Sequence, residues 1–513
     1  MRTITGGHRV RVAAAGLALA LTAGGVSTAL AVPVGPPPVV ASAGAPAAAP
    51  AAPATTGDEG RRIVQAAPWP LSRADTDFYK MVLLPDGFPG VRGGGRVVAH
   101  PIYGVYLLRA FLRDYRRTHD VRDRRALAVL GQAVRARMRP FHGALVFWYD
   151  AATSVQLTKS GGRVYSALTQ AYYMDVLSDV GVELHDAGLR STAALAFRSL
   201  LVPTSEGGVR SPGTAGPVLE EEPTRLPSAI LNGWLSALMS LRAYADRTHD
   251  PRAVSLLRAS AREVARRLPR YDLPQVLGSA YASLAYLTLR FDVPVGTAVR
   301  SASLTLDGRT VPLRLSAAGR ESDVVQLVRC GARRGGTVVA TCAGLELDVP
   351  VTSGGVSGTS QLRLDLRGPG GQTVRGTVSR GTYRYVHDLG RSVTGWTGRR
   401  KVGASVRLPV TIAVVRDALV PTTFKHYGGH RVNSYHGIHV SRLTALADIG
   451  GPVFEAYARR WRAEMCRWAG HPAYRLIPRS DLRCPSGTAA AATVRSGEDE
   501  GSDPDPGDEQ PGE

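Results

Sequence analysis

Three short stretches of the sequence combine glutamate, tyrosine and histidine, side chains that commonly act as general acids and bases. They lie at residues 218–224, 271–281 and 434–439, and the sequence around them is not dominated by the regular spacing of an amphipathic helix. Neither a nucleotide-binding glycine motif nor a metal-ligand spacing stands out. The stretches therefore predict a site that transfers protons or binds polar groups without a cofactor or a metal.

Each stretch also has a purely structural interpretation. Tyr435 begins a helix with apolar spacing, which is typical of a packed tyrosine. The acidic run at residues 220–222 suits a solvated helix N-terminus, where the helix dipole favours carboxylates. Tyr281 lies among alanine, leucine and Tyr286, as in an apolar core. The residue types alone leave these alternatives open.

A repeat of helices must position these stretches. Between residues 100 and 269 the apolar residues recur at spacings of three and four, which indicates amphipathic helices. The pattern breaks at RTHD (117–120), ELHD (183–186) and RTHD (247–250). Aspartate after a helix end is a good N-cap for the next helix, so these His-Asp pairs are interpreted as turns and not as catalytic pairs. The expected helices span residues 102–115, 124–138, 164–180, 189–201, 226–244 and 253–268.

A later copy of the pattern surrounds residues 446–449 and includes a helix at 452–468 that starts with proline, a favoured first residue. The long gap before this copy changes to alternating apolar and polar residues with many glycine turns. Residues 291–420 are therefore expected to form an inserted β-sandwich-like or barrel-like domain. Repeated helical hairpins bury their inner faces by stacking, either as an open solenoid or as a closed α/α toroid.

The two ends of the chain carry other signals. A basic start and an apolar, small-residue run ending at Ala31 are typical of a signal peptide at residues 1–31, so a secreted or cell-surface protein is expected. An uncleaved anchor helix is the alternative; otherwise no stable membrane insertion is expected after cleavage. Residues 32–60 are rich in proline and alanine, as in an extended linker, and residues 485–513 are expected to be a disordered, acidic tail.

The formal charge of +21 predicts a polyanionic partner. Nearly all of the positive charge is arginine, which suits bidentate binding of carboxylates or sulfates, although a GC-rich genome produces the same bias. No nucleic acid partner is expected, because the chain carries an export signal and lacks a recognised nucleic-acid-binding motif.

The four cysteines form two local pairs, Cys330 with Cys342 and Cys466 with Cys484. In an oxidising compartment this spacing predicts two disulfides, the first of them joining neighbouring strands of the β insert. The alternative, a metal site, favours closer cysteine spacing and histidine partners.

At the three polar stretches the sequence resembles the C-terminal catalytic domain of the D-glucuronyl C5-epimerases, the enzymes of heparan sulfate and heparosan maturation. Residues 220–224 and 231–233 are similar to the family's Glu-Glu-Tyr-Pro-Thr and Leu-Asn-Gly elements. Residues 268–272 resemble its Leu-Pro-x-Tyr-Asp element, and residues 435–439 its Tyr-His-x-x-His element. Further similarity is found at residues 100–102, 166–170 and 452–461. The motifs keep the family's order on both sides of the insert.

The family's domain is an α/α toroid, and its members are often dimers. The resemblance therefore implies a fold that is mainly α, with an α/α toroid of repeated helical hairpins at residues 61–290 and 421–484 and a β-sandwich-like insert at residues 291–420. It also implies a homodimer as one form of the protein.

The activity that the resemblance implies is that of an isomerase, which converts D-glucuronate to L-iduronate units in an acidic, heparosan-like polysaccharide. Removal of the C5 proton beside the carboxylate needs a base on one face of the sugar and an acid on the other. Tyr435 is implied as one of these groups, and Tyr281 or Glu222 as the opposing one; Glu222 stands where the family has tyrosine. Binding of the sugar or its carboxylate is implied for His436, His439, Glu221, Asn232, Gln170 and Tyr271.

Two other functions fit the same residues. A polysaccharide lyase begins with the same C5 proton abstraction and then eliminates the 4-substituent. A non-catalytic polysaccharide-binding protein would keep the fold and bind the polymer without turnover.

Overall fold

The computed structural model describes residues 58–72, 76, 79–93, 95–149, 164–221, 223, 226–274, 277–306, 309–316, 324–352, 359–385, 392–394, 399–411, 424–427, 430–471 and 474. The predicted signal peptide, nearly all of the linker and the acidic tail lie outside this part of the chain. Among the helices within it, none is both long and apolar enough to cross a bilayer.

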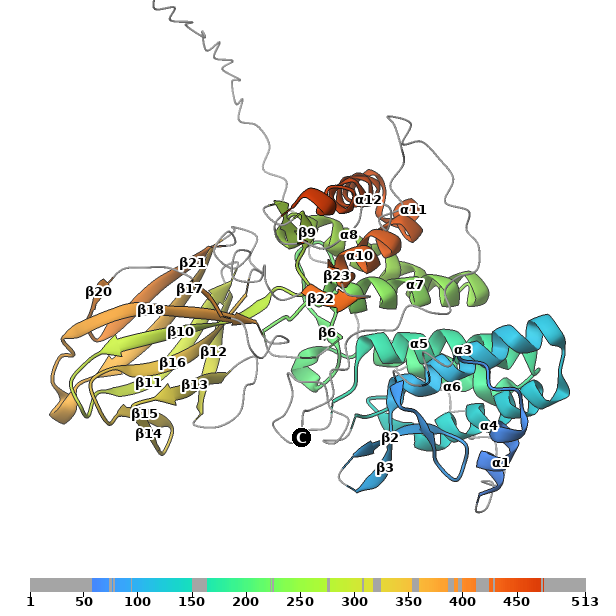
Figure 1. The fold of residues 1–513 in the computed structure, drawn as a ribbon. Helices are drawn as coiled ribbons and strands as arrows, with labels where there is room; N and C mark the ends of the chain where they lie inside the picture. The colour runs from blue at the N-terminus through green and yellow to red at the C-terminus, as the bar shows by residue number, and fades with distance from the viewer. Residues whose placement is uncertain are drawn as a thin grey trace, which may run out of the picture. The chain divides into compact units, whose positions relative to one another are not determined.

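Pairs of consecutive helices that pack on each other make up the helical part (Figure 1). The pairs are α3 (Pro101–Thr118) with α4 (Val121–Arg137), α5 (Ala167–Glu183) with α6 (Ala187–Ser199), α7 (Leu231–Thr248) with α8 (Pro251–Tyr271), and α10 (Ser434–Ala445) with α12 (Pro452–Met465). The short helix α11 (Ala447–Gly450) joins the last pair, and α1 (Glu59–Ala66) packs on α4.

The three His-Asp turns share two features. Each aspartate caps the second helix of its pair by accepting a hydrogen bond from a backbone N–H of the first turn, at Asp120, Asp186 and Asp250. The preceding histidines adopt the left-handed conformation, with φ of 54° at His119, 55° at His185 and 54° at His249. The prediction that these pairs are turn residues is confirmed, because both members are occupied in reversing the chain.

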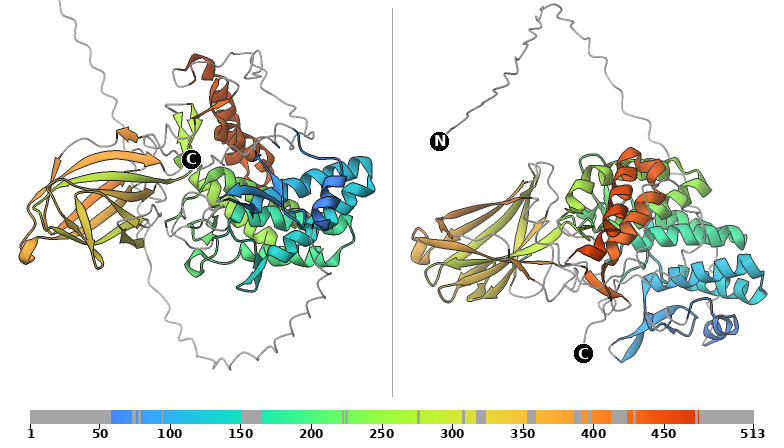
Figure 2. Two further views of the ribbon diagram at one scale, coloured as in Figure 1. Left: turned by 60° about the horizontal axis from the view of Figure 1, so that its bottom comes forward. Right: turned by 45° about the horizontal axis from the view of Figure 1, so that its top comes forward.

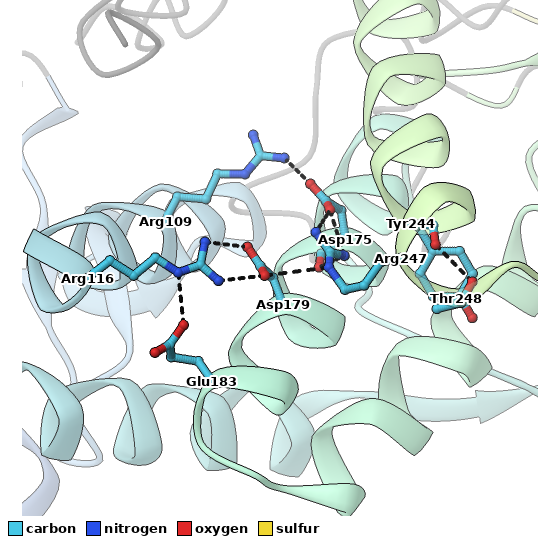
Figure 3. A network of polar contacts seen from close by, with 8 residues as sticks. All are labelled: Arg109, Arg116, Asp175, Asp179, Glu183, Tyr244, Arg247 and Thr248. Carbon is cyan, nitrogen blue, oxygen red and sulfur yellow. Dashed lines mark hydrogen bonds and ion pairs between the residues drawn. The ribbon is translucent and has the colours of Figure 1, made fainter. Parts of the chain in front are cut away.

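The first helices of the pairs, α3, α5, α7 and α10, pack against one another in chain order. An ion-pair network links three of them near their C-terminal ends (Figure 3). Arg116 of α3 binds Asp179 at 2.7 Å and Glu183 at 2.9 Å, both on α5, and Arg247 of α7 binds Asp175 of α5 at 3.1 Å. The network helps to fix the relative position of these three helices, together with Arg109 of α3, which donates to Asp175 of α5 and Ser240 of α7.

Strands β10 to β21 form a body of their own (Figures 1 and 2). Their bounds are β10 (Leu284–Asp292), β11 (Ala298–Leu306), β12 (Arg309–Ser316), β13 (Val324–Arg329), β14 (Gly331–Arg334), β15 (Thr337–Ala340), β16 (Leu345–Thr352), β17 (Thr359–Arg367), β18 (Gly376–Tyr385), β19 (Ser392–Thr394), β20 (Arg399–Val402) and β21 (Ser405–Thr411). Nine of them follow the order β14-β15-β11-β12-β13-β16-β10-β18-β19, while β17 pairs with β11 and β21, and β20 pairs with β18.

Alternation of side chains explains this body. In β17 the residues Leu362, Leu364 and Leu366 are buried. Gln361, which precedes them, and Arg363, which lies between the first two, are exposed. The predicted disulfide between Cys330 and Cys342 is present and joins the two ends of the β14–β15 hairpin. Cys466 is also disulfide-bonded, and its predicted partner, Cys484, lies outside the described residues.

Short strands also lie between the helices. They are β1 (Val82–Leu83), β2 (Pro89–Gly93), β3 (Arg96–Ala99), β4 (Arg139–Phe141), β5 (Ala144–Val146), β6 (Arg210–Ser211), β7 (Val218–Leu219), β8 (Asp272–Leu273), β9 (Gly278–Ser279), β22 (Phe424–Tyr427) and β23 (His430–Asn433). The prediction of a mainly α toroid is therefore wrong: the fold is mixed, with several sheets as well as helices. Two- to five-residue strands are too short to show a period in the sequence, so the helical pattern concealed them.

Candidate functional site

The predicted polar residues gather around the N-terminal ends of α5, α7 and α10. Backbone hydrogen bonds hold two of these ends: the Ala167 N–H donates to the Glu220 carbonyl at 3.0 Å, and the Leu231 N–H donates to the Tyr281 carbonyl at 2.9 Å. The segment after β7 therefore lies against the start of α5, and the segment after β9 lies against the start of α7. These ends are opposite to those joined by the ion-pair network, so the candidate site and the network are separated along the helices.

Ser279, in β9, connects two of the predicted histidines. Its hydroxyl lies 2.9 Å from Nδ1 of His436 and 2.7 Å from Nδ1 of His439. The two imidazoles belong to the first turns of α10 and lie three residues apart, a spacing that brings them to one face of the helix. The other ring nitrogen of His436, Nε2, lies 2.9 Å from the Trp461 carbonyl oxygen of α12. This chain of contacts joins α10, α12 and the β8–β9 hairpin.

The hydrogens in this chain can be assigned by counting donors. Burial lowers the pKa of His436 to about 4 and lowers that of His439 well below its usual value, so both rings are neutral at pH 7. A carbonyl only accepts, so His436 carries its hydrogen on Nε2 and accepts from the Ser279 hydroxyl at Nδ1. Ser279 has no second hydrogen, so His439 must donate from Nδ1. Its Nε2 is left as a buried lone pair without a hydrogen-bond partner among the described residues.

Tyr281 and Tyr435 lie in contact, although Tyr281 precedes the β insert in the sequence and Tyr435 follows it. Their ring centroids are 4.3 Å apart and the rings are inclined by 59°. Both side chains are buried, at 5% and 6% exposure. The contact brings together the two predicted acid or base tyrosines, but it leaves no room for a sugar ring between them.

The acidic stretch divides into residues with different environments. Glu220 is fully buried: its Oε2 accepts from the Ser228 hydroxyl and the Ala229 N–H, both at 2.9 Å, so it shapes the loop before α7. Burial raises the pKa of Glu220. The Glu221 carboxylate packs directly over Gly233 of α7, where a Cβ atom would collide with it. Glu222 lies outside the described residues.

Three of the predicted binding residues are buried. Tyr271 donates its hydroxyl hydrogen to the Ala229 carbonyl at 2.5 Å, and burial raises its pKa, so its hydroxyl is occupied by the loop that precedes α7. Gln170 donates to the Phe147 carbonyl at 3.2 Å. The Gln170 Oε1 and Asn232 Oδ1 atoms are buried and have no hydrogen-bond partner within the described ranges. These two oxygens are unpartnered acceptors at the starts of α5 and α7.

The sequence did not identify Ser279, the Trp461 carbonyl or Asp272 as individual parts of this arrangement. Asp272 accepts from Trp461 Nε1 at 3.0 Å and pairs with Arg460 at 2.5 Å, which anchors α12 on the β8–β9 hairpin. A usable signal was the spacing of the two histidines on one helical face, because it implies a shared partner. Across the residues the structure describes, no group of three or more potential ligands could hold a metal ion.

Fold and site together define a protein of paired helices whose tyrosines and histidines cluster at one end of the first helices. Residues 146–291 match the family described as D-glucuronyl C5-epimerase C-terminus. The resemblance predicted from the sequence is confirmed over this segment, and it supports an epimerase-like function of the isomerase class. The segment contains Gln170, Glu221, Asn232, Tyr271 and Tyr281. A comparison with curated proteins gave no match.

Proposed function

We propose that the protein is an exported C5-epimerase that converts D-glucuronate to L-iduronate units within an acidic, heparosan-like polysaccharide. The observation that carries this proposal is the contact between Tyr281, inside the family match, and Tyr435, outside it. Their burial beside two neutral histidines gives proton-transferring groups an environment with little water. Support for an acidic substrate comes from the net charge of +21, and support for export from the N-terminal sequence.

The reaction breaks the C5–H bond, leaves an enediolate at the carboxylate, and forms a new C5–H bond from the opposite face. Because the rings of Tyr281 and Tyr435 touch each other, they do not face each other across a sugar. We therefore assign Tyr435 as one acid or base and Glu222 as the opposing group. Tyr281 then orients the Tyr435 ring. The unpartnered acceptors of Asn232 and Gln170 suit sugar hydroxyls.

The test is incubation of the purified protein with heparosan in deuterated water, followed by proton NMR of the polymer. Deuterium at C5 without chain cleavage is the expected result. Release of an unsaturated, ultraviolet-absorbing uronate would instead identify a lyase, and binding without exchange would identify a binding protein.

Variants then separate the roles of the three residues. Tyr435→Phe and Glu222→Gln should each lower C5 exchange by at least about a hundredfold, as expected for loss of an acid or base. Tyr281→Phe keeps the ring contact and should retain most of the exchange. The assignment of Glu222 is wrong if Glu222→Gln exchanges normally while Tyr281→Phe is inactive.

A further inference from the structure

The outer face of three neighbouring strands, β11, β17 and β21, carries several arginine side chains and none of the tyrosines and histidines of the candidate site. These strands lie side by side in the β10–β21 body (Figure 1). Residues 291–420 contain 18 arginine and lysine residues against 9 aspartate and glutamate residues. The excess is already present in this part of the chain alone, so a polyanion could be bound there independently of the helical part.

Strand register determines which side chains share this face. Leu362, Leu364 and Leu366 point into the core, so Arg363, Asp365 and Arg367 of β17 point outward. The residue directly opposite Arg363 on β21 is Arg407, which is also exposed.

Two arginines at one cross-strand position repel each other, which disfavours the pair unless an anion lies between them. Asp365 relieves this repulsion only in part. Its Oδ1 accepts from Arg363 Nε at 3.2 Å, and its Oδ2 accepts from the Ser301 hydroxyl at 2.8 Å. The hydrogen bond from Ser301, together with Arg363, keeps the pKa of Asp365 below its usual value, so it is ionised.

Arg407 and Arg367 make no ion pair with any residue that the structure describes, although both are exposed. Around them lie small hydroxyl side chains: Ser303 is opposite Arg363 on β11, and Ser405, opposite Asp365 on β21, forms a hydrogen bond with the Asp365 carboxylate. Unpaired guanidinium groups bind carboxylates through two parallel hydrogen bonds, and serine hydroxyls bind sugar hydroxyls. The face thus combines groups suited to both parts of a uronate unit.

We propose that the outer face of β11, β17 and β21 is a docking surface for an acidic polysaccharide chain, separate from the residues that would carry out proton transfer. The choice of polymer rests on the proposed function; the presence of an anion-binding face does not. Binding on this face would hold a long substrate near the enzyme without adding to the chemistry. The contribution of this face to the affinity for the polymer should increase with polymer length and decrease with salt.

The test is the affinity of the full-length secreted protein for heparosan at low and high salt. The double variant Arg363→Ser with Arg407→Ser should bind about tenfold more weakly at low salt, as expected for loss of charge-assisted hydrogen bonds. The control removes the same charge from an exposed helix face, by Arg258→Ser with Arg262→Ser in α8, and should bind within about twofold of the parent. If the double variant does not fold, Arg407→Ser alone serves, because that side chain has no ion-pair partner to leave behind.

Equal affinity of the parent and the strand variant would overturn the proposal, as would an equal loss in the helix control. So would a duplex nucleic acid that binds this face as tightly as heparosan. Turnover separates the two ideas: a strand variant that binds polymer weakly but epimerises a short oligosaccharide at the parental rate supports both. A protein that shows no exchange, yet loses heparosan affinity in the strand variant alone, supports the docking surface and removes the proposed function.

Discussion

At the scale of single residues, Ser279 has one hydroxyl hydrogen and two imidazole neighbours, so it forces them into opposite forms. His436 is held with its hydrogen on Nε2 by the Trp461 carbonyl, and His439 is then held with its hydrogen on Nδ1. The chain ends on a carbonyl that cannot release a proton. It therefore orients the two rings and does not conduct protons between them.

The assignment predicts a spectroscopic signature. In protein labelled with ¹⁵N-histidine, ring correlation spectra should show one buried ring protonated on Nε2 and one on Nδ1, both unchanged between pH 6 and 8 because burial keeps the rings neutral. Ser279→Ala should abolish the Nδ1-protonated form, whereas Ser279→Thr keeps a hydroxyl and should retain it. Two rings of the same form in the parent protein would contradict the assignment.

The sequence predicted the members of this site better than their contacts. The motif around Tyr435, His436 and His439 predicted residues that lie together in the first turns of α10, with His436 and His439 on one helical face; their role in binding or catalysis stays a prediction. It gave no sign that Tyr281 would touch the Tyr435 ring, or that the Tyr271 hydroxyl would be occupied by the Ala229 carbonyl. Such contacts depend on the path of loops such as the one before α7, and no local pattern encodes that path.

At the scale of elements, the helical repeat could be predicted from the sequence because each turn contains the same pair of residue types. A capping aspartate and a left-handed histidine recur three times, and both leave a signal in the sequence. The strands between the helices were not readable, since hairpins such as β8–β9 contain two residues per strand. These hairpins nevertheless position Ser279 and Asp272, so the unpredicted part of the fold is the part that builds the site.

The equivalence of the three turns can be measured. Asp120→Ala, Asp186→Ala and Asp250→Ala should each lower the free energy of unfolding by about 1 kcal/mol, because each removes one side-chain cap. The corresponding asparagine variants should stay close to the parent, since asparagine caps as well as aspartate. Chemical denaturation of the six variants checks this. A loss that is the same for alanine and asparagine would show that charge, and not capping, matters at these turns.

At the scale of the whole molecule, two kinds of buried group oppose each other as the pH changes. Burial raises the pKa of Glu464 to about 7 from a usual 4.5, and the Asp272 carboxylate adds to this rise. Arg460 lies 3.7 Å from Glu464 and, with Arg467, acts in the opposite direction, but burial dominates. For His436 the effect is reversed: burial lowers its pKa from a usual 6.5 to about 4. The pKa of His439 is lowered as well.

The signs follow from linkage. Glu464 binds a proton more readily in the folded state, so its contribution to stability is full below pH 4.5 and is lost as the pH rises through about 7. The histidines bind a proton less readily in the folded state, so their contribution is full above pH 6.5 and is lost on acidification, for His436 as the pH falls through about 4. Between these limits the two effects partly cancel, and the parent protein should have a shallow stability profile.

Glu464→Gln should remove the pH-dependent contribution of Glu464 to stability. Glutamine stays neutral, so the variant should melt at a higher temperature than the parent above pH 7, where the parent must bury a charged carboxylate. This advantage should shrink as the pH falls and disappear near pH 4.5, the usual pKa of the group. Melting temperatures of the parent and the variant from pH 4.5 to 8 check the prediction, with Glu455→Gln in the exposed first turn of α12 as a control that should shift little. A difference between Glu464→Gln and the parent that does not change with pH would mean that the pKa of Glu464 is the same in the folded and unfolded protein, and that Arg460 and Arg467 offset its burial.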